Sequence, residues 1–227
     1  MNLSDFLAHQ VAAGRRRIGQ LVIGCLDDPG PFRFRLCHLA DAARLAGGAA
    51  DHGLDEFHGP DRARELSTWG DDGSYRFAKA QPNLRCGWVM WLHDAAELRH
   101  ALDGFYPAAV GLWRALDHGG IEVQHLRDKL ERQTGMYRFA RNISNDGAQQ
   151  LVRELCGPAH QCAKRILWQI DAATPLDDSE ASRFDGLPPD APAGTAIPLV
   201  CREACNHFVA QCRIVSKREF KTSEREA

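Results

Sequence analysis

The sequence predicts an α+β protein in which a small N-terminal part mixes β and α structure and the remainder is rich in helices. Three features of the 227 residues support this class. Short apolar runs bounded by turn residues fill the N-terminal part, capped amphipathic helices prevail after residue 94, and four cysteines form two close pairs in the last third. We expect a first, α+β domain at 1–105 and a second, helix-rich domain at 106–227 that carries both cysteine pairs, with a proline-rich loop at 174–198.

The N-terminal part begins with a short amphipathic helix. Ser4 can cap this helix, and Gly14 can end it. Residues 21–26 and 32–39 are then predicted to be strands, because both runs are apolar and Asp28-Pro29-Gly30-Pro31 between them has the composition of a turn. The N-terminal part is therefore predicted to contain a β-hairpin.

A buried strand and several helices follow the hairpin. Residues 86–92 alternate as a buried strand, in which Trp88 and Trp91 are expected to be core residues and not a platform for stacking. Pro107 fits the first turn of a helix. Helices are expected at residues 60–68, 94–102, 107–116 and 121–132.

The C-terminal part places cysteines at the ends of its predicted elements. Ser144 can cap a helix that Gly157-Pro158 stops, so Cys156 is expected at the end of this helix. Residues 166–170 are predicted to form a strand. A last helix is expected to begin near residues 198–201 and to continue to about Lys217.

The composition of the chain excludes several classes of protein. A formal charge of −2 gives no global basic field, so a protein that holds nucleic acid mainly through its phosphates is not expected. Arg15-Arg16-Arg17 before an apolar run imitates a secretory signal, but Gly19, Gln20 and Gly24 interrupt the run and no cleavage site follows it. No stretch reaches membrane-spanning length. We therefore expect a soluble, cytoplasmic protein whose cysteines are reduced or bound to metal.

The two cysteine pairs are the most informative feature of the sequence. Cys156 and Cys162 flank a loop with adjacent glycine and proline, while Cys201 and Cys205 lie four residues apart and would share one face of a helix. Thiolates are the ligands that iron-sulfur clusters and zinc select. The positive end of the helix dipole near Cys201 would also favour thiolates and a negatively charged cluster. Two such pairs can supply four ligands to one metal centre.

Two other interpretations of these cysteines stay open. The second pair continues to Phe208 and Cys212 with the spacing of an ordinary core-facing helix stripe, which would explain that pair without metal. His160 and His207 lie in the same segments, so a mixed Cys/His zinc site is the chemical alternative. We favour an all-cysteine site because four thiols make the histidines unnecessary, and because His207 would point away from the face of the second pair.

The remaining cysteines are expected to lie outside the metal site. Cys25, Cys37 and Cys86 fall in predicted strands, where a small buried hydrophobic residue is the default role of cysteine. Cys212 is expected to be a spare or core residue.

Several segments of the chain together resemble a known bacterial family. They are Tyr75-Arg76, Pro82-Asn83-Leu84-Arg85, Gly87-Trp88, Phe105-Tyr106-Pro107-Ala108-Ala109, Arg132-Gln133-Thr134-Gly135-Met136-Tyr137-Arg138 and Cys201-Arg202-Glu203-Ala204-Cys205-Asn206. The family is the module that accompanies CbiX-like sirohydrochlorin chelatases, in which a small chelatase domain is followed by a stabilising domain and a [4Fe-4S]-binding domain. The resemblance covers roughly residues 30 to 215.

This resemblance implies a [4Fe-4S] cluster and a set of ligands for it. The ligands would be the four cysteines already favoured on chemical grounds, Cys156, Cys162, Cys201 and Cys205, with Cys212 as an extra. We expect these 227 residues to leave no room for the chelatase domain and to lack its strand-end histidines. We therefore expect an accessory or electron-transfer protein of sirohydrochlorin, cobalamin or sirohaem metabolism, working with a separate CbiX-like chelatase or a redox partner, and not a chelatase by itself.

The alternatives to this function belong to other classes of protein. One is a structural zinc-binding interaction module with no redox role. Another is an enzyme that uses His93 and His100, although no nucleophile elbow, phosphate loop or carboxylate pair supports it. Arg132, Arg138 and Arg141 can meet the carboxylates of an anionic tetrapyrrole, or they can be solvated arginines beside a turn.

Overall fold

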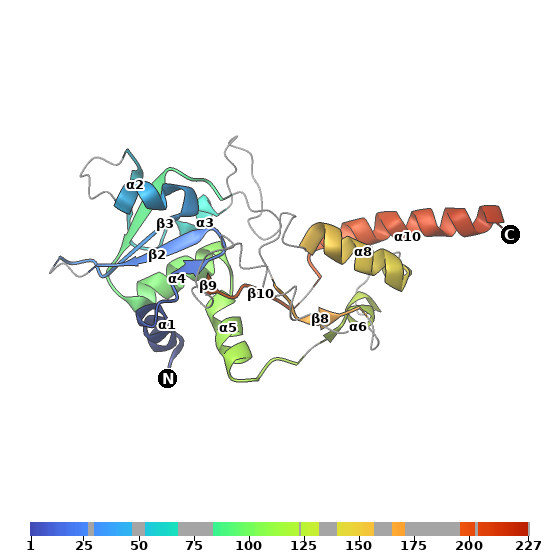
Figure 1. Cartoon of the computed structure of the whole chain (residues 1–227), viewed down its shortest axis with the longest axis horizontal. Coiled ribbons are helices and arrows are strands. Elements are labelled where there is room, and N and C mark those ends of the chain that lie inside the picture. Colours follow the sequence, from blue (N-terminus) through green and yellow to red (C-terminus); the bar gives the residue numbers. More distant parts are fainter. Residues whose placement is uncertain are drawn as a thin grey trace. The chain divides into compact units, whose positions relative to one another are not determined.

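The computed structural model describes residues 1–26, 30–46, 53–67, 84–122, 124–131, 140–156, 165–170, 196–202 and 204–226. The chain divides into two compact units, one comprising Met1–Gly120 and Leu187–Leu199 and the other Ile121–Gly186 and Val200–Ala227. Both units combine helices with strands, which confirms the α+β class (Figure 1). The sequence placed the domain boundary after residue 105, whereas the first unit also includes the helix that follows that boundary.

The first unit is built on a six-stranded sheet with the order β4-β5-β3-β2-β1-β9. Its strands are β1 (Arg17–Ile18), β2 (Leu21–Cys25), β3 (Phe34–His38), β4 (Asp55–His58), β5 (Trp88–Leu92) and β9 (Ala196–Ile197). The predicted hairpin is confirmed, because β2 and β3 pair antiparallel from Leu21↔His38 to Cys25↔Phe34. Strand β5 pairs antiparallel with β3 and parallel with β4, so the most apolar strand lies inside the sheet.

Helices of the first unit complete its core. They are α1 (Leu3–Ala12), α2 (Ala42–Ala46), α3 (Ala63–Leu66), α4 (Ala95–Phe105), α5 (Ala109–Asp117) and the 3-10 turn η1 (Leu39–Asp41). Helix α1 packs against α4 and α5, where the Phe6 and Trp113 rings meet edge to face at 4.9 Å. Helix α4 reaches the sheet through Phe105, whose ring stacks on Trp88 at 5.1 Å. These aromatic contacts add to the apolar burial that stabilises the unit.

The start of the first helix differs from the sequence prediction. Asn2, and not Ser4, caps α1, since Asn2 Oδ1 accepts the backbone N–H of Asp5 at 2.9 Å. An asparagine at this position is as good a cap as serine. Gly14 follows the helix with a φ of +96°, which agrees with its predicted role in ending α1.

The two tryptophans of β5 differ in burial. Trp88 is 1% exposed, whereas Trp91 is half-buried and donates from Nε1 to Glu56 Oε2 on β4 at 3.1 Å. The prediction that both belong to the core is confirmed for Trp88, while Trp91 packs, partly buried, against a smaller core cluster with Cys37 and Val89. Strand β4 was missed because Asp55-Glu56-Phe57-His58 is polar, and its pairing with β5 outweighs the low strand propensity.

The second unit consists of two packed helices and short strand pairs. Its elements are β6 (Gln124–His125), α6 (Leu126–Glu131), α8 (Asn145–Cys156), β7 (Arg165–Ile166), β8 (Trp168–Gln169), β10 (Val200–Cys201) and α10 (Asn206–Glu226). Helix α8 packs along α10 (Figure 1). Strand β7 pairs parallel with β10, and β6 pairs parallel with β8. The apolar core of this unit comprises Leu126, Leu130, Ala140, Ile143, Ala148, Leu151, Trp168, Ile170, Phe208, Val209 and Cys212, and we call it the C-terminal core.

Three boundaries in the second unit differ from the prediction. The strand expected at 166–170 is two strands with different partners, and the helix expected at 121–132 is preceded by β6. The last helix begins at Asn206, because Val200-Cys201 pairs with β7 instead of starting a helix. Pairing between distant segments cannot be found from local helix signals. Of the loop expected at 174–198, residues 174–195 lie outside the described residues.

Glu219 of α10 is hydrogen-bonded to the start of α8. Its carboxylate accepts the backbone N–H of Ser144 at 3.0 Å and also the Ser144 hydroxyl. The Ser144 Oγ in turn accepts the N–H of Gly147 at 2.9 Å, which confirms Ser144 as the cap of this helix. A Cβ at position 147 would come too close to Glu219 Oε1, so the Glu219 carboxylate would have to shift to accommodate it. A carboxylate beside a helix N-terminus also interacts favourably with the helix dipole.

We expect Glu219→Ala to lower the free energy of unfolding by about 1 kcal/mol, since two exposed hydrogen bonds to the start of α8 are lost. Glu219→Gln is the matched control, because an amide keeps an acceptor and removes only the charge, so a smaller loss is expected. Chemical denaturation followed by circular dichroism measures both. Equal midpoints for Glu219→Ala and the unaltered chain would contradict the role of this contact.

No helix in the described parts of the chain has the length and apolar character required to cross a membrane.

Candidate metal centre

The cysteines of the chain separate between the two units. Cys25, Cys37 and Cys86 belong to the first unit, and all the others belong to the second unit: Cys156, Cys162, Cys201, Cys205 and Cys212. The three predicted ligands that the structure describes, Cys156, Cys201 and Cys205, are therefore in the same unit. Disulfide bonds are not formed by any of the seven cysteines that the structure describes. Cys162 lies outside the described residues.

Cys205 occupies the N-cap position of α10. It immediately precedes Asn206, the first residue of the helix, and its Sγ accepts the backbone N–H of Phe208 at 3.4 Å. The sulfur thus takes the place of the serine or aspartate oxygen that usually caps a helix. The N–H donor and the positive end of the helix dipole suit a thiolate that binds a negatively charged cluster.

Cys156 and Cys201 also lie at the ends of their elements. Cys156 is the last residue of α8, as expected, and Cys201 is the last residue of β10. Both side chains are half-buried, like that of Cys205. Cys156 and Cys205 pack against the C-terminal core, so the core itself connects a member of the first predicted pair with a member of the second.

The donor set fits an iron-sulfur cluster in its chemistry. Thiolates are the ligands of [4Fe-4S] clusters, and a cap donor at 3.4 Å from Cys205 Sγ is a contact that stabilises negative charge on sulfur. Within the described ranges, no three His, Cys, Asp or Glu side chains gather so closely that they could hold one metal ion. A cluster requires a different arrangement, because each of its irons takes its own cysteine.

Two sequence interpretations of the second pair were wrong in their geometry. Cys201 and Cys205 do not stack on one helix face, because Cys201 ends a strand and Cys205 precedes the helix. For the same reason these two cysteines do not form a core-facing helix stripe with Cys212. Cys212 does belong to the core, where it is 0% exposed, so its expected role as a core residue is confirmed.

Of the other groups predicted for the site, the structure describes only His207 and Arg141. His207 is exposed in the first turn of α10, and Arg141 is also exposed. His160 and the run Arg132–Arg138 lie outside the described residues. The zinc alternative and the tetrapyrrole contacts of the arginines therefore remain predictions.

The described cysteines of the first unit have three different environments. Cys37 is buried in β3, Cys25 is half-buried in β2, and Cys86 is exposed just before β5. The expectation that Cys86 is a buried strand residue was wrong, because β5 begins at Trp88. Burial raises the pKa of the Cys37 thiol from 9.0 to about 11, while the nearby Arg35 opposes this rise and Asp41 adds to it.

We expect the folded protein at pH 8 to be alkylated by iodoacetamide at Cys86 and not at Cys37, because the Cys37 thiol is buried and protonated. Peptide mass spectrometry measures this difference, and alkylation of Cys37 at the rate of Cys86 would contradict it.

The raised pKa of Cys37 also makes the stability of the folded protein depend on pH. Between pH 9.0 and about 11 the unfolded chain releases the proton first, so the contribution of Cys37 to stability falls as pH rises.

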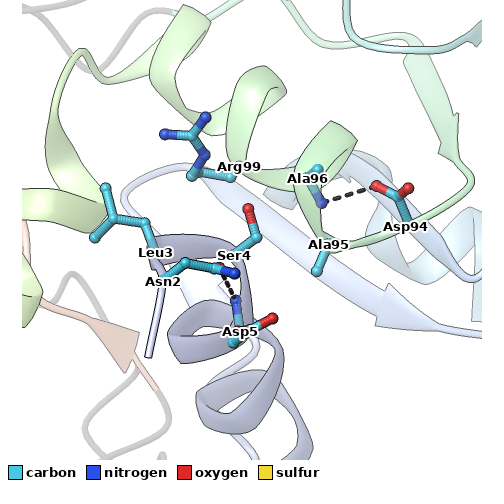
Figure 2. A pocket seen from close by; sticks show the side chains of 8 residues that line it. All are labelled: Asn2, Leu3, Ser4, Asp5, Asp94, Ala95, Ala96 and Arg99. Atoms are coloured by element: carbon cyan, nitrogen blue, oxygen red, sulfur yellow. Dashed lines mark hydrogen bonds between the residues drawn. The ribbon is translucent and has the colours of Figure 1, made fainter.

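A separate hollow of about 570 Å³ lies at the N-terminal ends of α1 and α4 (Figure 2). It is lined by Asn2, Leu3, Ser4, Asp5, Asp94, Ala95, Ala96 and Arg99. Asp94 Oδ1 accepts the N–H groups of Ala96 and Glu97 at 2.8 and 2.9 Å, so the cap already takes up the donors that would bind an anion. None of the lining residues carries a thiol, and the hollow is not part of the metal centre.

Of the two histidines of the enzyme hypothesis, His93 makes hydrogen bonds that support the start of α4. His93 Nδ1 lies 3.0 Å from Glu97 Oε2, and the same carboxylate oxygen accepts the His93 backbone N–H at 2.8 Å. These bonds form at the start of α4, on an exposed face. His100 is exposed on the same helix.

Two family models match the chain, and they divide it at nearly the same position as its two compact units. A family model described as the DR2241 stabilising domain matches residues 5–117, and one described as a 4Fe-4S iron-sulfur cluster binding domain matches residues 118–214. No curated protein matches the chain.

A solved structure is similar over almost the whole chain. It is DR2241 from Deinococcus radiodurans, described as a multi-domain protein with structural similarity to chelatases and with two additional novel domains. The match has a TM-score of 0.69 at 24% identity and covers 95% of this chain and 41% of that one. At this identity the similarity establishes the fold, and the chain spans less than half of the length of DR2241.

Proposed function

Since this chain joins a DR2241-type stabilising domain to a 4Fe-4S cluster-binding domain, we propose that it is an accessory iron-sulfur protein that transfers electrons in tetrapyrrole metal chelation. The two family matches confirm the resemblance found in the sequence, and the cofactor is a [4Fe-4S] cluster. The tetrapyrrole context is supported by the chelatase-like similarity described for DR2241.

The observation that carries this proposal is the placement of the candidate ligands in the cluster-binding domain. Cys156, Cys162, Cys201 and Cys205 all fall within residues 118–214, and Cys205 receives an N–H donor at a helix start. We propose these four as the ligands. When bound, a cluster with four cysteine ligands supplies one-electron chemistry, and it leaves no iron open for a substrate.

The protein's own residues would hold the cluster and shield it. The half-buried positions of Cys156 and Cys205 against the C-terminal core keep one side of the site apolar, which lowers access of water. The proposed partners are a separate CbiX-like chelatase or a redox protein, and an anionic tetrapyrrole that meets Arg132 and Arg138. A cytoplasmic location is part of this proposal, because free thiols stay reduced in that compartment.

The proposal is tested by reversible reduction and by a reconstituted chelation assay. The anaerobic protein is reduced with dithionite, reoxidised and reduced again, and is then added to a single-domain CbiX-like chelatase with sirohydrochlorin and Co²⁺. We expect reversible bleaching and binding to the chelatase or a faster metal insertion. A cluster that cannot be reduced, together with no binding and no change in rate, would overturn the proposal.

A further inference from the structure

The indole N–H of Trp168 is a buried donor with no acceptor among the residues that the structure describes. Trp168 lies on β8 and is 3% exposed, and its Nε1 atom makes no hydrogen bond. An indole nitrogen can only donate, and buried donors in native proteins almost always have a partner. By contrast, Nε1 of the buried Trp88 in the first unit donates to the carbonyl oxygen of Arg85.

Trp168 lies in the core against which two of the candidate ligands, Cys156 and Cys205, pack. Its ring meets that of Phe208 edge to face, with 5.3 Å between centroids. The backbone N–H of Phe208 is the donor to Cys205 Sγ, so one residue contacts both the tryptophan ring and a proposed ligand. Cys156 packs against the same C-terminal core. The unsatisfied donor therefore belongs to the part of the molecule that borders the proposed cluster.

Among the described residues, two buried atoms of β6 without a hydrogen bond can compete as the acceptor, Gln124 Oε1 and His125 Nδ1. Gln124 is the register partner of Trp168 in the β6–β8 pair, and its Oε1 atom is also buried without a hydrogen bond. The two residues are neighbours across the paired strands but are not bonded to each other. Among the described residues, the indole donor and the amide acceptor thus both lack a partner.

We propose that Trp168 donates a hydrogen bond from Nε1 to a sulfur of the [4Fe-4S] cluster and thereby raises its reduction potential; this inference rests on the proposed function. Sulfide and thiolate sulfurs accept hydrogen bonds, and such bonds help to set cluster potentials. The reduced cluster carries one more negative charge than the oxidised cluster. A donor aimed at its sulfurs therefore stabilises the reduced state more than the oxidised state.

The test compares variants of the full chain that contain the loaded cluster. Trp168→Phe removes the N–H and keeps an aromatic ring, and a chain with 3-benzothienylalanine at position 168 removes only the N–H while keeping the shape of the indole. Trp88→Phe is the matched control, since it removes a buried indole N–H in the first unit. Gln124→Leu removes the competing amide acceptor. Potentiometric titration and proton ENDOR of the reduced cluster in H₂O and D₂O are the measurements.

We expect both position-168 variants to shift the redox equilibrium towards the oxidised state by up to tenfold, which is about 59 mV for one electron. They should also lose one exchangeable proton coupling, while Trp88→Phe and Gln124→Leu leave the potential and the coupling unchanged. An unchanged potential and a retained coupling in the benzothienylalanine protein, with iron and sulfide contents equal to the unaltered chain, would overturn this inference and leave the proposed function standing. Absence of iron and sulfide from the unaltered chain would instead refute the proposed function.

Discussion

The Cys205→Ser variant is expected to lose the [4Fe-4S] cluster, with the iron content falling from about four per chain to nearly none. Cys205 combines a proposed ligand with the cap of α10, where its Sγ accepts the Phe208 N–H. Serine keeps an oxygen that can cap the helix, so the helix start is preserved while the soft ligand is removed. The same loss is expected for serine at Cys156, Cys162 and Cys201.

The control for this prediction is Cys212→Ala, which should retain the cluster. Cys212 is fully buried in the C-terminal core, so alanine there costs packing and leaves the proposed ligands intact. Iron and acid-labile sulfide per chain are measured for each anaerobically prepared variant. A cluster that survives Cys205→Ser but is lost in Cys212→Ala would show that the ligand set is wrong.

The second large effect is expected for Gly19→Ala, which should lower the free energy of unfolding by about 3 kcal/mol or more. Gly19 has a φ of +54°, a conformation that disfavours any side chain. A Cβ there would collide with the Tyr106 hydroxyl and would lie 2.9 Å from Leu199 Cδ1. The same hydroxyl accepts the N–H of Gln20 at 3.1 Å, so relieving the collision would disturb this hydrogen bond.

Gly119→Ala separates the cost of backbone strain from the cost of the collision with Tyr106 in Gly19→Ala. Gly119 has a similar φ of +65°, but nothing lies within 4 Å of an added Cβ. Backbone strain alone is then expected to cost about 1 kcal/mol. Chemical denaturation of both variants gives the comparison, and equal losses would show that the collision with Tyr106 is unimportant.

Local patterns in the sequence predicted the elements that have strong local signals. The β2–β3 hairpin has a turn sequence between two apolar runs, and α8 has the Ser144 cap and an apolar repeat that ends at Cys156. The elements that were missed have weak local signals and depend on partners far along the chain. Strand β9 pairs with β1 across more than 170 residues of sequence, as Arg17↔Ala196.

The four-cysteine ligand set stays a prediction, whereas the geometry expected for its second pair was wrong. Thiol chemistry and the pair spacing selected four cysteines, and the three that the structure describes lie in one unit and in the segment that matches the cluster-binding family. Pairing between β7 and β10 moved Cys201 off the expected helix, and this could not be read from a spacing of four residues. The Cys205 cap would have been found by treating a cysteine before an amphipathic run as an N-cap, in the way that serine is treated.

The central claim is that four cysteines of the second unit hold a [4Fe-4S] cluster, and metal analysis of the anaerobically purified chain tests it most directly. We predict about four irons and four acid-labile sulfides per chain, in a brown protein that dithionite bleaches. A colourless protein that contains zinc, or one that contains no metal after anaerobic reconstitution with iron and sulfide, would contradict the claim.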